Sequence, residues 1–315
     1  MKKATIAVCT YNRAKNLEAL VKGLKQQACQ FPFDIIVVDN SSTDNTQYVL
    51  RALGRESGPA LRVVKEERCG IVYARNRAID ESAGSDYMAF IDDDELPVSG
   101  WLQAAVDALD REGAECAGGQ IRVKVPQDGR PGWLERELLG FLGEVSHSDK
   151  PFWITGRETP VWSGNIAYRT SLFRDGLRFD ERYNRRGDGV GGGEDNAMFG
   201  TLLERGAKIR YRPDMVIEHL IDDWKLRRMY FLTLHYLAGK KEGAWEDSDY
   251  ERAYCGVPPF MIAQALRQWG KAFEMILMRR PGALRQAMNG SYALGMIGGR
   301  FRRWRQGQGQ EERTR

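Results

Sequence analysis

The chain has few cysteines and no long apolar run, and each absence excludes a class of protein. Its five cysteines lie far apart, with an odd total and no CxxC spacing, so neither a zinc knuckle nor a disulfide framework is indicated. No segment reaches the ~18–20 apolar residues of a membrane-spanning helix. The N-terminal MKKATIAVCTYN also lacks the apolar region of a signal peptide. We therefore expect a cytoplasmic protein that is neither exported nor inserted across a bilayer.

Two common phosphate-binding motifs are missing as well. The turn after the first predicted strand contains no glycine, so the GxGxxG motif that lets a backbone approach a dinucleotide pyrophosphate is absent. No GxxxxGK[ST] sequence occurs either. These absences argue against a nicotinamide oxidoreductase and against a P-loop NTPase.

What remains is the composition of a folded globular protein. The 315 residues are 42% hydrophobic, 29% charged and 10% aromatic, enough for one large domain or two ordinary ones. The formal charge of +4 is unevenly distributed. From Arg267 onward, 11 basic and 3 acidic residues give +8, whereas the first 266 residues hold 36 basic and 40 acidic residues, a net charge of −4.

The first hundred residues alternate between short apolar runs and helical patterns, which predicts an α/β fold with a mostly parallel, doubly wound sheet and flanking helices. We expect strands covered on both faces at Thr5–Cys9, Ile35–Val38, Leu61–Val64 and Met88–Ile91. Later strands are predicted at Gln120–Val125, Asn165–Tyr168 and Lys208–Arg212. Helices are predicted around Leu17–Leu24, Asp44–Leu53, Ile71–Ser82, Leu102–Leu109 and Asp195–Arg205, with mainly helices after His219. A glycine-rich turn is expected at Gly187–Gly193, and loops with short helices at Pro126–Pro160.

Polar residues directly follow three of these strands. They are Thr10, Tyr11, Asn12 and Arg13 after the first strand, Asp39 to Ser42 after the second, and Asp92, Asp93, Asp94 and Glu95 after the fourth. Ligands of an open parallel sheet bind outside the carboxyl ends of its strands, so these residues predict an acidic, hydrogen-bonding cleft there. A carboxylate such as that of Asp39 accepts hydrogen bonds from a base or a ribose.

The four consecutive carboxyl residues predict a metal site. They repel one another unless a cation lies among them, and Asp92 and Asp94 point to the same side of an extended chain. Oxygen ligands favour Mg²⁺ or Mn²⁺. The alternative is a solvated acidic turn before Pro97. His219, one of three histidines, is a second candidate ligand whose alternative is a structural role.

A second acidic pair, Glu194 and Asp195, follows Gly191–Gly193 at the start of a helical pattern. Glycines let the chain approach a ligand closely, and a helix N-terminus favours a carboxylate. The pair therefore fits either a ligand site or an ordinary helix cap.

The order of the motifs resembles one known family. They are CTYNR (9–13), VVDNSSTDNT (37–46), ARNRAI (74–79), FIDDDE (90–95), SGNIAYR (163–169), GGED (192–195) and PDMVIEH (213–219). Over residues 4–235 this series is similar to the family 2 glycosyltransferases, and within them to bacterial exopolysaccharide and succinoglycan-type glucosyltransferases. The resemblance implies the GT-A fold and transfer of a sugar, with inversion, from a nucleotide-sugar donor to a hydroxyl of a glycan or lipid-linked acceptor.

The same resemblance implies a role for each matching residue. The residues expected to contact the nucleotide-sugar are Thr10, Tyr11, Asn12, Arg13, Asp39, Arg75, Asp92 and Asp93. Metal ligands, for Mn²⁺ or Mg²⁺, are Asp94, Asp92 and His219. Asp195 is the catalytic base, with Glu194 as the other candidate. Ser163, Gly164 and Asn165 face the sugar and the acceptor.

These expectations divide the chain into three parts. Residues 1–235 form the catalytic domain, with a nucleotide-sugar half at 1–125 and an acceptor half at 126–235. Residues 236–305 form a basic helical extension, and residues 306–315 a disordered tail.

The basic extension mixes apolar and basic residues at helical spacing. Its apolar members are Phe260, Ile262, Leu266, Trp269, Phe273, Ile276 and Leu277. This composition suits a helix lying at the anionic inner face of the plasma membrane, near a lipid-linked acceptor. The alternative is a helix that packs on the catalytic domain and leaves a solvated basic face.

Two other functions compete with glycosyl transfer. A sugar nucleotidyltransferase also uses a doubly wound sheet with a metal site, but usually has a glycine-rich first loop with basic residues, which is lacking here. A nucleic-acid-binding protein would use the Arg/Trp-rich tail. The acidic cleft would repel nucleic-acid phosphates, so we expect no nucleic-acid partner.

Overall fold

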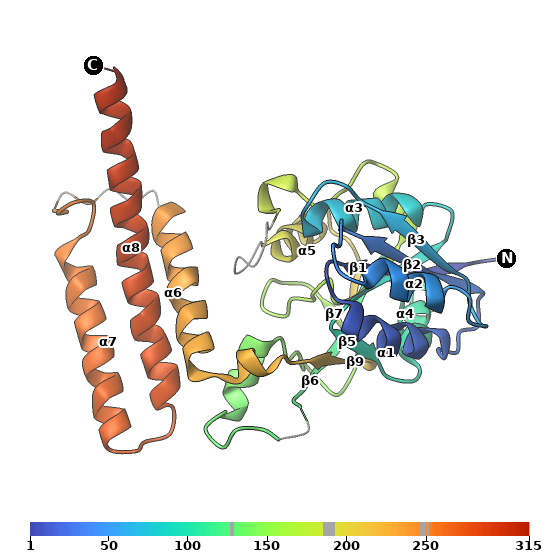
Figure 1. The fold of residues 1–315 in the computed structure, drawn as a ribbon, viewed down its shortest axis with the longest axis horizontal. Helices are drawn as coiled ribbons and strands as arrows, with labels where there is room; N and C mark the ends of the chain where they lie inside the picture. Colours follow the sequence, from blue (N-terminus) through green and yellow to red (C-terminus); the bar gives the residue numbers. More distant parts are fainter. Residues whose placement is uncertain (127–128, 185–192, 246–249, 251, 315) are drawn as a thin grey trace. The chain divides into compact units, whose positions relative to one another are not determined.

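The computed structural model describes residues 1–126, 129–184, 193–245, 250 and 252–314 (Figure 1). The chain divides into two compact units, one made of Met1–Gln127 and Leu142–Ile221 and the other of Asp128–Phe141 and Asp222–Arg315. The first unit contains the sheet, and the second contains the three long C-terminal helices. Each unit has its own buried apolar residues.

The first unit is an α/β structure whose elements alternate as the sequence predicts. Its strands are β1 (Ala4–Thr10), β2 (Phe33–Asp39), β3 (Leu61–Lys65), β4 (Tyr87–Asp92), β5 (Glu95–Pro97), β6 (Cys116–Lys124), β7 (Phe152–Ile154), β8 (Asn165–Arg169) and β9 (Ile209–Leu220). Its helices are α1 (Ala14–Lys25), α2 (Thr46–Leu53), α3 (Ile71–Glu81), α4 (Trp101–Asp110) and α5 (Glu194–Glu204), with a 3₁₀ turn at Glu181–Tyr183.

Over the described residues these strands form one nine-stranded sheet in the order β3-β2-β1-β4-β8-β6-β9-β5, with β7 paired to β9. The first four strands are parallel, as predicted. Their apolar runs are buried because helices cover the sheet, and α1 buries the predicted stripe from Leu17 to Leu24. Strand β3 differs from the expectation: it lies at the edge of the sheet, and most of its residues are not buried.

The second half of the sheet is mixed. Strand β8 runs antiparallel to both β4 and β6, and β9 is parallel to β6. The strand predicted at Lys208–Arg212 is longer than expected and runs as β9 from Ile209 to Leu220. A register shift opposite Gly119 makes this possible, since a Cβ at Gly119 would lie 1.9 Å from the Met215 carbonyl oxygen.

The helical unit contains α6 (Arg228–Trp245), α7 (Pro259–Leu277) and α8 (Ala283–Thr314), with α8 lying between the other two (Figure 1). Helices α6 and α8 approach each other through glycines. A Cβ at Gly243 would lie 2.2 Å from the Met296 carbonyl oxygen, and one at Gly299 would lie 2.2 Å from that of Lys240. Small residues on both helices therefore set this close contact.

The observed boundaries correct the predicted division of the chain. The boundary expected at residue 235 falls inside α6, and the structure places it between Ile221 and Asp222. Most of the segment from 128 to 141, expected in the acceptor half, belongs to the helical unit. The tail expected to be disordered from residue 306 is the end of α8 as far as Thr314, because the helix continues without a break.

Among the residues that the structure describes, no helix combines the length and the apolar character that crossing a bilayer requires.

Candidate active site

The carboxyl ends of β1, β2 and β4 bring the predicted polar residues to one edge of the sheet. The parallel register places Thr10 beside Asp39 and Cys9 beside Asp92. The Thr10 hydroxyl donates to Asp93 Oδ2 at 2.7 Å, and Arg13 Nε lies 4.0 Å from Asp93 Oδ1. The polar residues predicted from the strand ends therefore lie side by side at this edge.

Arg75 of α3 joins the two acidic motifs, although they lie more than a hundred residues apart in the chain. Its Nη1 donates to Glu194 Oε1 at 2.9 Å and to Asp195 Oδ1 at 2.7 Å, and its Nη2 lies 3.6 Å from Asp92 Oδ1. Burial alone would lower the pKa of the Arg75 guanidinium, but Asp195, Asp92 and Glu194 outweigh it and raise that pKa. Arg75 is thus a permanent buried cation beneath three carboxylates.

Asp195, in the first turn of α5, is held from two sides. The Ser163 hydroxyl donates to Asp195 Oδ1, the same oxygen that accepts from Arg75. Ser163 and Arg75 are both buried, whereas the Asp195 side chain is 24% exposed. Two donors therefore fix the position of Oδ1.

Glu194 is positioned differently from its neighbour. Its Oε1 accepts from Arg75, whereas its Oε2 is buried and, among the described residues, has no hydrogen-bond partner. The residue is nearly enclosed, with 11% of its side chain exposed. The acidic pair thus presents Asp195 rather than Glu194 to the cleft. Gly193 before the pair has φ of 89°, a backbone conformation that glycine adopts without strain, whereas Gly187–Gly192 of the predicted turn lie outside the described residues.

Two carboxyl groups of the acidic run after β4 have raised pKa values. Burial, followed by Asp94 and Asp92, raises the pKa of Asp93 to about 7 despite its hydrogen bond from Thr10. Burial, Asp92 and Asp94 also raise the pKa of Glu95 well above its ordinary value. Negative charge is therefore in excess around the end of β4.

The candidate metal ligands lie close together. His219 Nε2 lies 3.4 Å from Asp94 Oδ2, because β9 pairs with β5 and sets His219 opposite Glu95. No group of three or more His, Cys, Asp or Glu side chains arranged to hold a metal occurs within the described part of the chain. Mg²⁺-type ions are commonly held by one or two carboxylates plus substrate phosphates, so two protein ligands suffice for such a site.

The loops after β1 and β2 are tied to each other. Asn12, at φ of 54°, accepts through Oδ1 from the Thr43 amide at 2.7 Å, and its own amide donates to Ser42. Asp39 accepts from the Ser42 amide and from Gln47. Tyr11 is 52% exposed at the rim. Asn12 and Asp39 therefore shape the predicted nucleotide loop through contacts within the protein.

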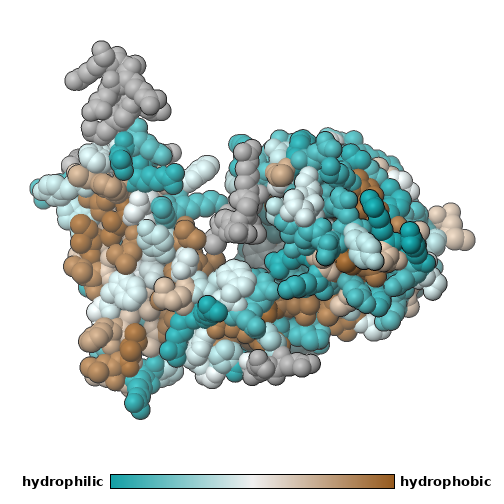
Figure 2. Space-filling view, viewed as in Figure 1, coloured by the Kyte–Doolittle hydropathy of each residue, from teal (hydrophilic) through white to brown (hydrophobic). Residues whose placement is uncertain are grey.

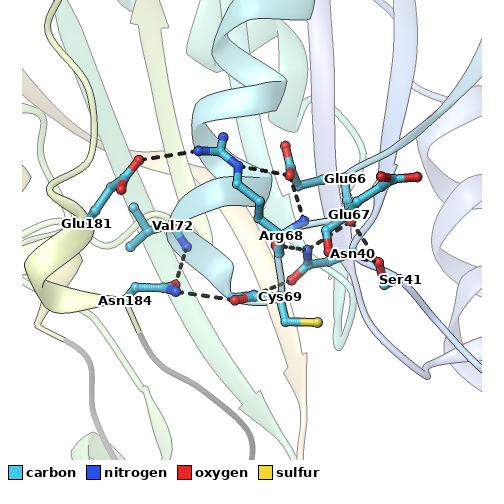
Figure 3. A network of polar contacts seen from close by, with 10 residues as sticks. Asn40, Ser41, Glu66, Glu67, Arg68, Cys69, Val72, Glu181 and Asn184 are labelled. Carbon is cyan, nitrogen blue, oxygen red and sulfur yellow. Dashed lines mark hydrogen bonds and ion pairs between the residues drawn. The ribbon is translucent and has the colours of Figure 1, made fainter.

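A network next to this loop was missed by the sequence analysis (Figure 3). Asn40 donates to the carbonyl oxygens of Glu66 and Arg68 and accepts from the Gly70 amide, and Asn184 accepts from the Val72 amide. Gly70 has φ of 136°, and a Cβ there would lie 2.1 Å from the Asn184 side chain. These contacts fix the entry into α3 and so the place of Arg75. The signal available in the sequence was Asn40 beside Asp39 and a glycine directly before a helical pattern.

The three residues predicted to face the sugar and the acceptor, Ser163, Gly164 and Asn165, are all buried. Asn165 is 1% exposed, and its side chain accepts from Trp101 Nε1 and donates to the carbonyl oxygens of Gln120 and Met215. It therefore holds β6, β9 and α4 together, and the expectation that it faces the acceptor is wrong. A Cβ at Gly164 would lie 2.5 Å from Glu95 Oε1, so this glycine serves close packing behind the cleft.

Comparison with known proteins identifies relatives along most of the chain. The family model described as Glycosyl transferase family 2 matches residues 5–177. The chain is 27% identical over 295 residues to Glycosyltransferase AglE of Haloferax volcanii, covering 88% of this chain and 89% of that protein. It is 25% identical over 242 residues to Succinoglycan biosynthesis protein ExoM of Rhizobium meliloti, covering 76% and 73%.

Solved structures share the fold. One is the mannosyltransferase PcManGT from Pyrobaculum calidifontis, in complex with GDP-Man and Mn²⁺. It superimposes with a TM-score of 0.61 at 17% identity, covering 93% of this chain and 85% of that one. The predicted GT-A fold is confirmed by this likeness.

Proposed function

This chain belongs to glycosyl transferase family 2, and from that premise we propose that it moves a sugar from a nucleotide-sugar donor to an acceptor hydroxyl with inversion at the anomeric carbon. The observation that carries the proposal is Asp195, fixed through Oδ1 by Ser163 and Arg75 beside the acidic run of β4. A positioned base next to a site for a charged leaving group is what a single displacement requires.

Asp195 acts as the general base. Its Oδ2 takes the proton of the acceptor hydroxyl while the hydroxyl oxygen bonds to the anomeric carbon and the bond from that carbon to the diphosphate oxygen breaks. General-base assistance is worth about 10²–10⁴ in rate. Arg75 and Ser163 keep the carboxylate in place, and Arg75 balances part of the acidic charge that surrounds it.

The residues present fit a divalent cation. Asp94 Oδ2 and His219 Nε2 lie 3.4 Å apart, and carboxylate oxygens and imidazole nitrogens are donors that such a cation accepts. Asp94 and His219, with Asp92 nearby, would hold Mn²⁺ or Mg²⁺. When bound, the cation supplies charge that stabilises the departing diphosphate. The complex of PcManGT with GDP-Man and Mn²⁺ supports this assignment.

The donor contacts follow from the edge of the sheet. Thr10, Tyr11, Asn12, Arg13 and Asp39 surround the nucleotide, with Asp92 and Asp93 at the ribose and diphosphate. The exposed ring of Tyr11 and the loop that Asn12 and Asp39 hold support this placement. Arg75 acts from beneath, through the carboxylates that it binds.

The name of one relative supports a class of acceptor. ExoM is a succinoglycan biosynthesis protein, and this chain matches it over 76% of its own length. We assign the chain to the synthesis of a surface polysaccharide or exopolysaccharide, with a glycan or lipid-linked acceptor, on the cytoplasmic side of the membrane. Nucleotide-sugars are consumed there, and the five cysteines, all free, suit a reducing compartment.

A donor panel tests the proposal. The purified chain, with Mn²⁺ and UDP-, GDP- and dTDP-sugars, is expected to release the nucleoside diphosphate with at least one donor and to transfer the sugar with inverted configuration. Release of pyrophosphate from a nucleoside triphosphate and a sugar phosphate would instead identify a nucleotidyltransferase and overturn it. A retained anomeric configuration would overturn the single displacement.

A further inference from the structure

Resting on the proposed function, we propose that one apolar face of the α7–α8 hairpin seats on an anionic lipid surface. This face deepens the proposed function by locating the enzyme where a lipid-linked acceptor is found. It is defined by five residues of α7 and two of α8: Ile262, Leu266, Trp269, Phe273, Ile276, Leu294 and Phe301.

The α7 part of the face is a row along one side of the helix. Its residues follow one another at intervals of four, three, four and three, which places them on one side of an α-helix. Ile262, Leu266, Phe273 and Ile276 are between 48% and 69% exposed. The neighbouring side of α7, with Met261, Ala265 and Ala272, is already buried in the helical unit. Solvent therefore meets a second apolar side of α7 that packing within the unit does not use.

The row continues onto α8. Trp269 lies against Gly290, where a Cβ would be 2.8 Å from its Nε1. From Gly290, intervals of four and eleven residues reach Leu294 and Phe301 on the same side of α8, and both are exposed by more than 40%. Hydrophobic surface is visible over α7 and α8 in the space-filling view (Figure 2). A patch shared by two helices is broader than the seam of a single helix pair.

The two sides of α7 differ in chemistry. Gln264, Arg267, Gln268 and Lys271 lie together on one side of α7, where they line a pocket. Gln264 is two residues from Leu266, so about 200° of helical rotation separates them. The hairpin is therefore amphipathic across its thickness, as in a helix that lies in a membrane interface.

The positive charge of the C-terminal helices favours an anionic lipid surface over a second copy of the chain as the partner of this face. From Arg267 onward the net charge is +8, and Arg267, Lys271, Arg302 and Arg303 are exposed. Arg267 and Lys271 lie on the polar side of α7 with Gln264 and Gln268, which is where basic residues lie in helices at an anionic lipid surface, whereas a contact between two copies through the apolar row would not use them. Each basic residue near such a surface contributes about 1 kcal/mol, roughly a fivefold change in partition.

Co-flotation of the full chain with vesicles tests the face. With roughly one-third phosphatidylglycerol in phosphatidylcholine, the chain is expected to float, and with pure phosphatidylcholine to float far less. Leu266→Asp is expected to lower the partition coefficient about tenfold to a hundredfold, since it removes a leucine that the lipid would bury. The matched control, Gln264→Asp, introduces the same charge on the polar side and is expected to lower it by at most about fivefold. Both positions are exposed, so unchanged melting temperatures are expected for both variants.

Three outcomes decide the matter. Equal losses in the two variants, or flotation of Leu266→Asp at the level of the unchanged chain, would overturn the proposal. A lipid-free dimer that Leu266→Asp converts to a monomer would assign the face to a second copy and also overturn it. Nucleoside diphosphate release by the same preparations without vesicles reports on the proposed function separately: release without flotation overturns only the lipid face, and flotation without release leaves it standing.

Discussion

Arg75 is the residue that connects the two acidic motifs. It is buried and contacts Asp92, Glu194 and Asp195, which come from the ends of β4 and the start of α5. A buried charge is stable only when it is paired, and removing one partner leaves the others uncompensated. The arginine therefore fixes the relative position of the proposed base and the proposed metal site.

Asp195→Asn isolates the proposed base. The variant keeps the shape and the Ser163 contact but cannot take a proton, so kcat is expected to fall by about 10²–10⁴. Donor binding, measured by titration calorimetry with a nucleoside diphosphate and Mn²⁺, is expected to stay within a few-fold. Near-normal transfer by this variant would remove Asp195 from the role and make Glu194 the next candidate.

Ser163→Ala tests whether the hydroxyl positions Asp195. Hydrogen bonds to charged groups contribute about 1.5–3 kcal/mol, so losing this one is expected to lower kcat by roughly tenfold or more. The donor KM is expected not to change, because Ser163 is buried and bonds to Asp195. A parallel change in donor KM with kcat unaffected would mean that Ser163 contacts the donor instead.

Asp93→Asn has a predicted dependence on pH. The pKa of Asp93 is about 7 in the folded chain and about 3.9 in an unfolded one, so the folded state holds a proton that the unfolded state has released. Stability therefore falls as the pH rises from about 4 to 7, and the asparagine removes this loss. In metal-free buffer at pH 8 the variant is expected to be more stable by on the order of 1 kcal/mol, or about 2–4 °C in Tm.

The control for this pH dependence is Asp80→Asn. Asp80 lies on the surface and pairs with Arg178. Exposed ion pairs contribute little, so the slope of Tm against pH is expected to match that of the unchanged chain. If Asp93→Asn had the same slope of Tm against pH as the unchanged chain, the pKa of Asp93 would not be raised in the fold.

The sequence predicted which residues of the site lie at the sheet edge, but not what they contact. Thr10, Asp39 and the run from Asp92 follow strands whose register is local, so their common edge was predictable. Arg75 was expected to contact the nucleotide-sugar, and its contacts with residues 194 and 195 arise only from the tertiary fold. Asn165 was misplaced because its motif does not reveal that three buried partners satisfy its amide.

Among the secondary-structure elements, those with strong local periodicity were predicted best. Strands β1, β2 and β4 and the helices between them follow buried runs and apolar stripes. Strands β5 and β7 have three residues each, and their pairing with β9 comes from the assembled sheet. The start of the helical unit was placed too late because α6 begins close behind β9, without a glycine or proline between them.

The contact between α6 and α8 is predicted to depend on glycine. Gly243→Ala would place a methyl group 2.2 Å from the Met296 carbonyl oxygen. Relief of this clash requires the backbones of α6 and α8 to move apart, which weakens their packing. We expect a loss of about 1–3 kcal/mol in the unfolding free energy. Thermal denaturation followed by circular dichroism measures it.

Gly270→Ala is the matched control. Gly270 lies inside α7, and no atom would lie within 4 Å of an added Cβ. The alanine is expected to stabilise the helix by about 0.5–1 kcal/mol. If Gly243→Ala raised the unfolding free energy as Gly270→Ala does, the α6–α8 contact would be looser than the 2.2 Å distance indicates.

For the whole molecule, the division into two units predicts two thermal transitions. Both units have buried apolar residues of their own, and the residues of the proposed nucleotide site all belong to the first unit. A nucleoside diphosphate with Mn²⁺ at about 100 times its Kd is expected to stabilise that unit by about 2.7 kcal/mol and to raise one transition only. Gly243→Ala is expected to lower the other. A single calorimetric transition that responds to both changes would contradict this.

The exposed position of β3 has a consequence for how the chain behaves at high concentration. An edge strand with free backbone groups is a template on which another chain can add, and this is a common start of aggregation. Strand β3 is short and carries Arg62 and Lys65 on either side of Val63 and Val64. Charged side chains on an edge strand oppose the addition of another chain. The exposed, charged β3 therefore keeps the sheet from extending into a second molecule.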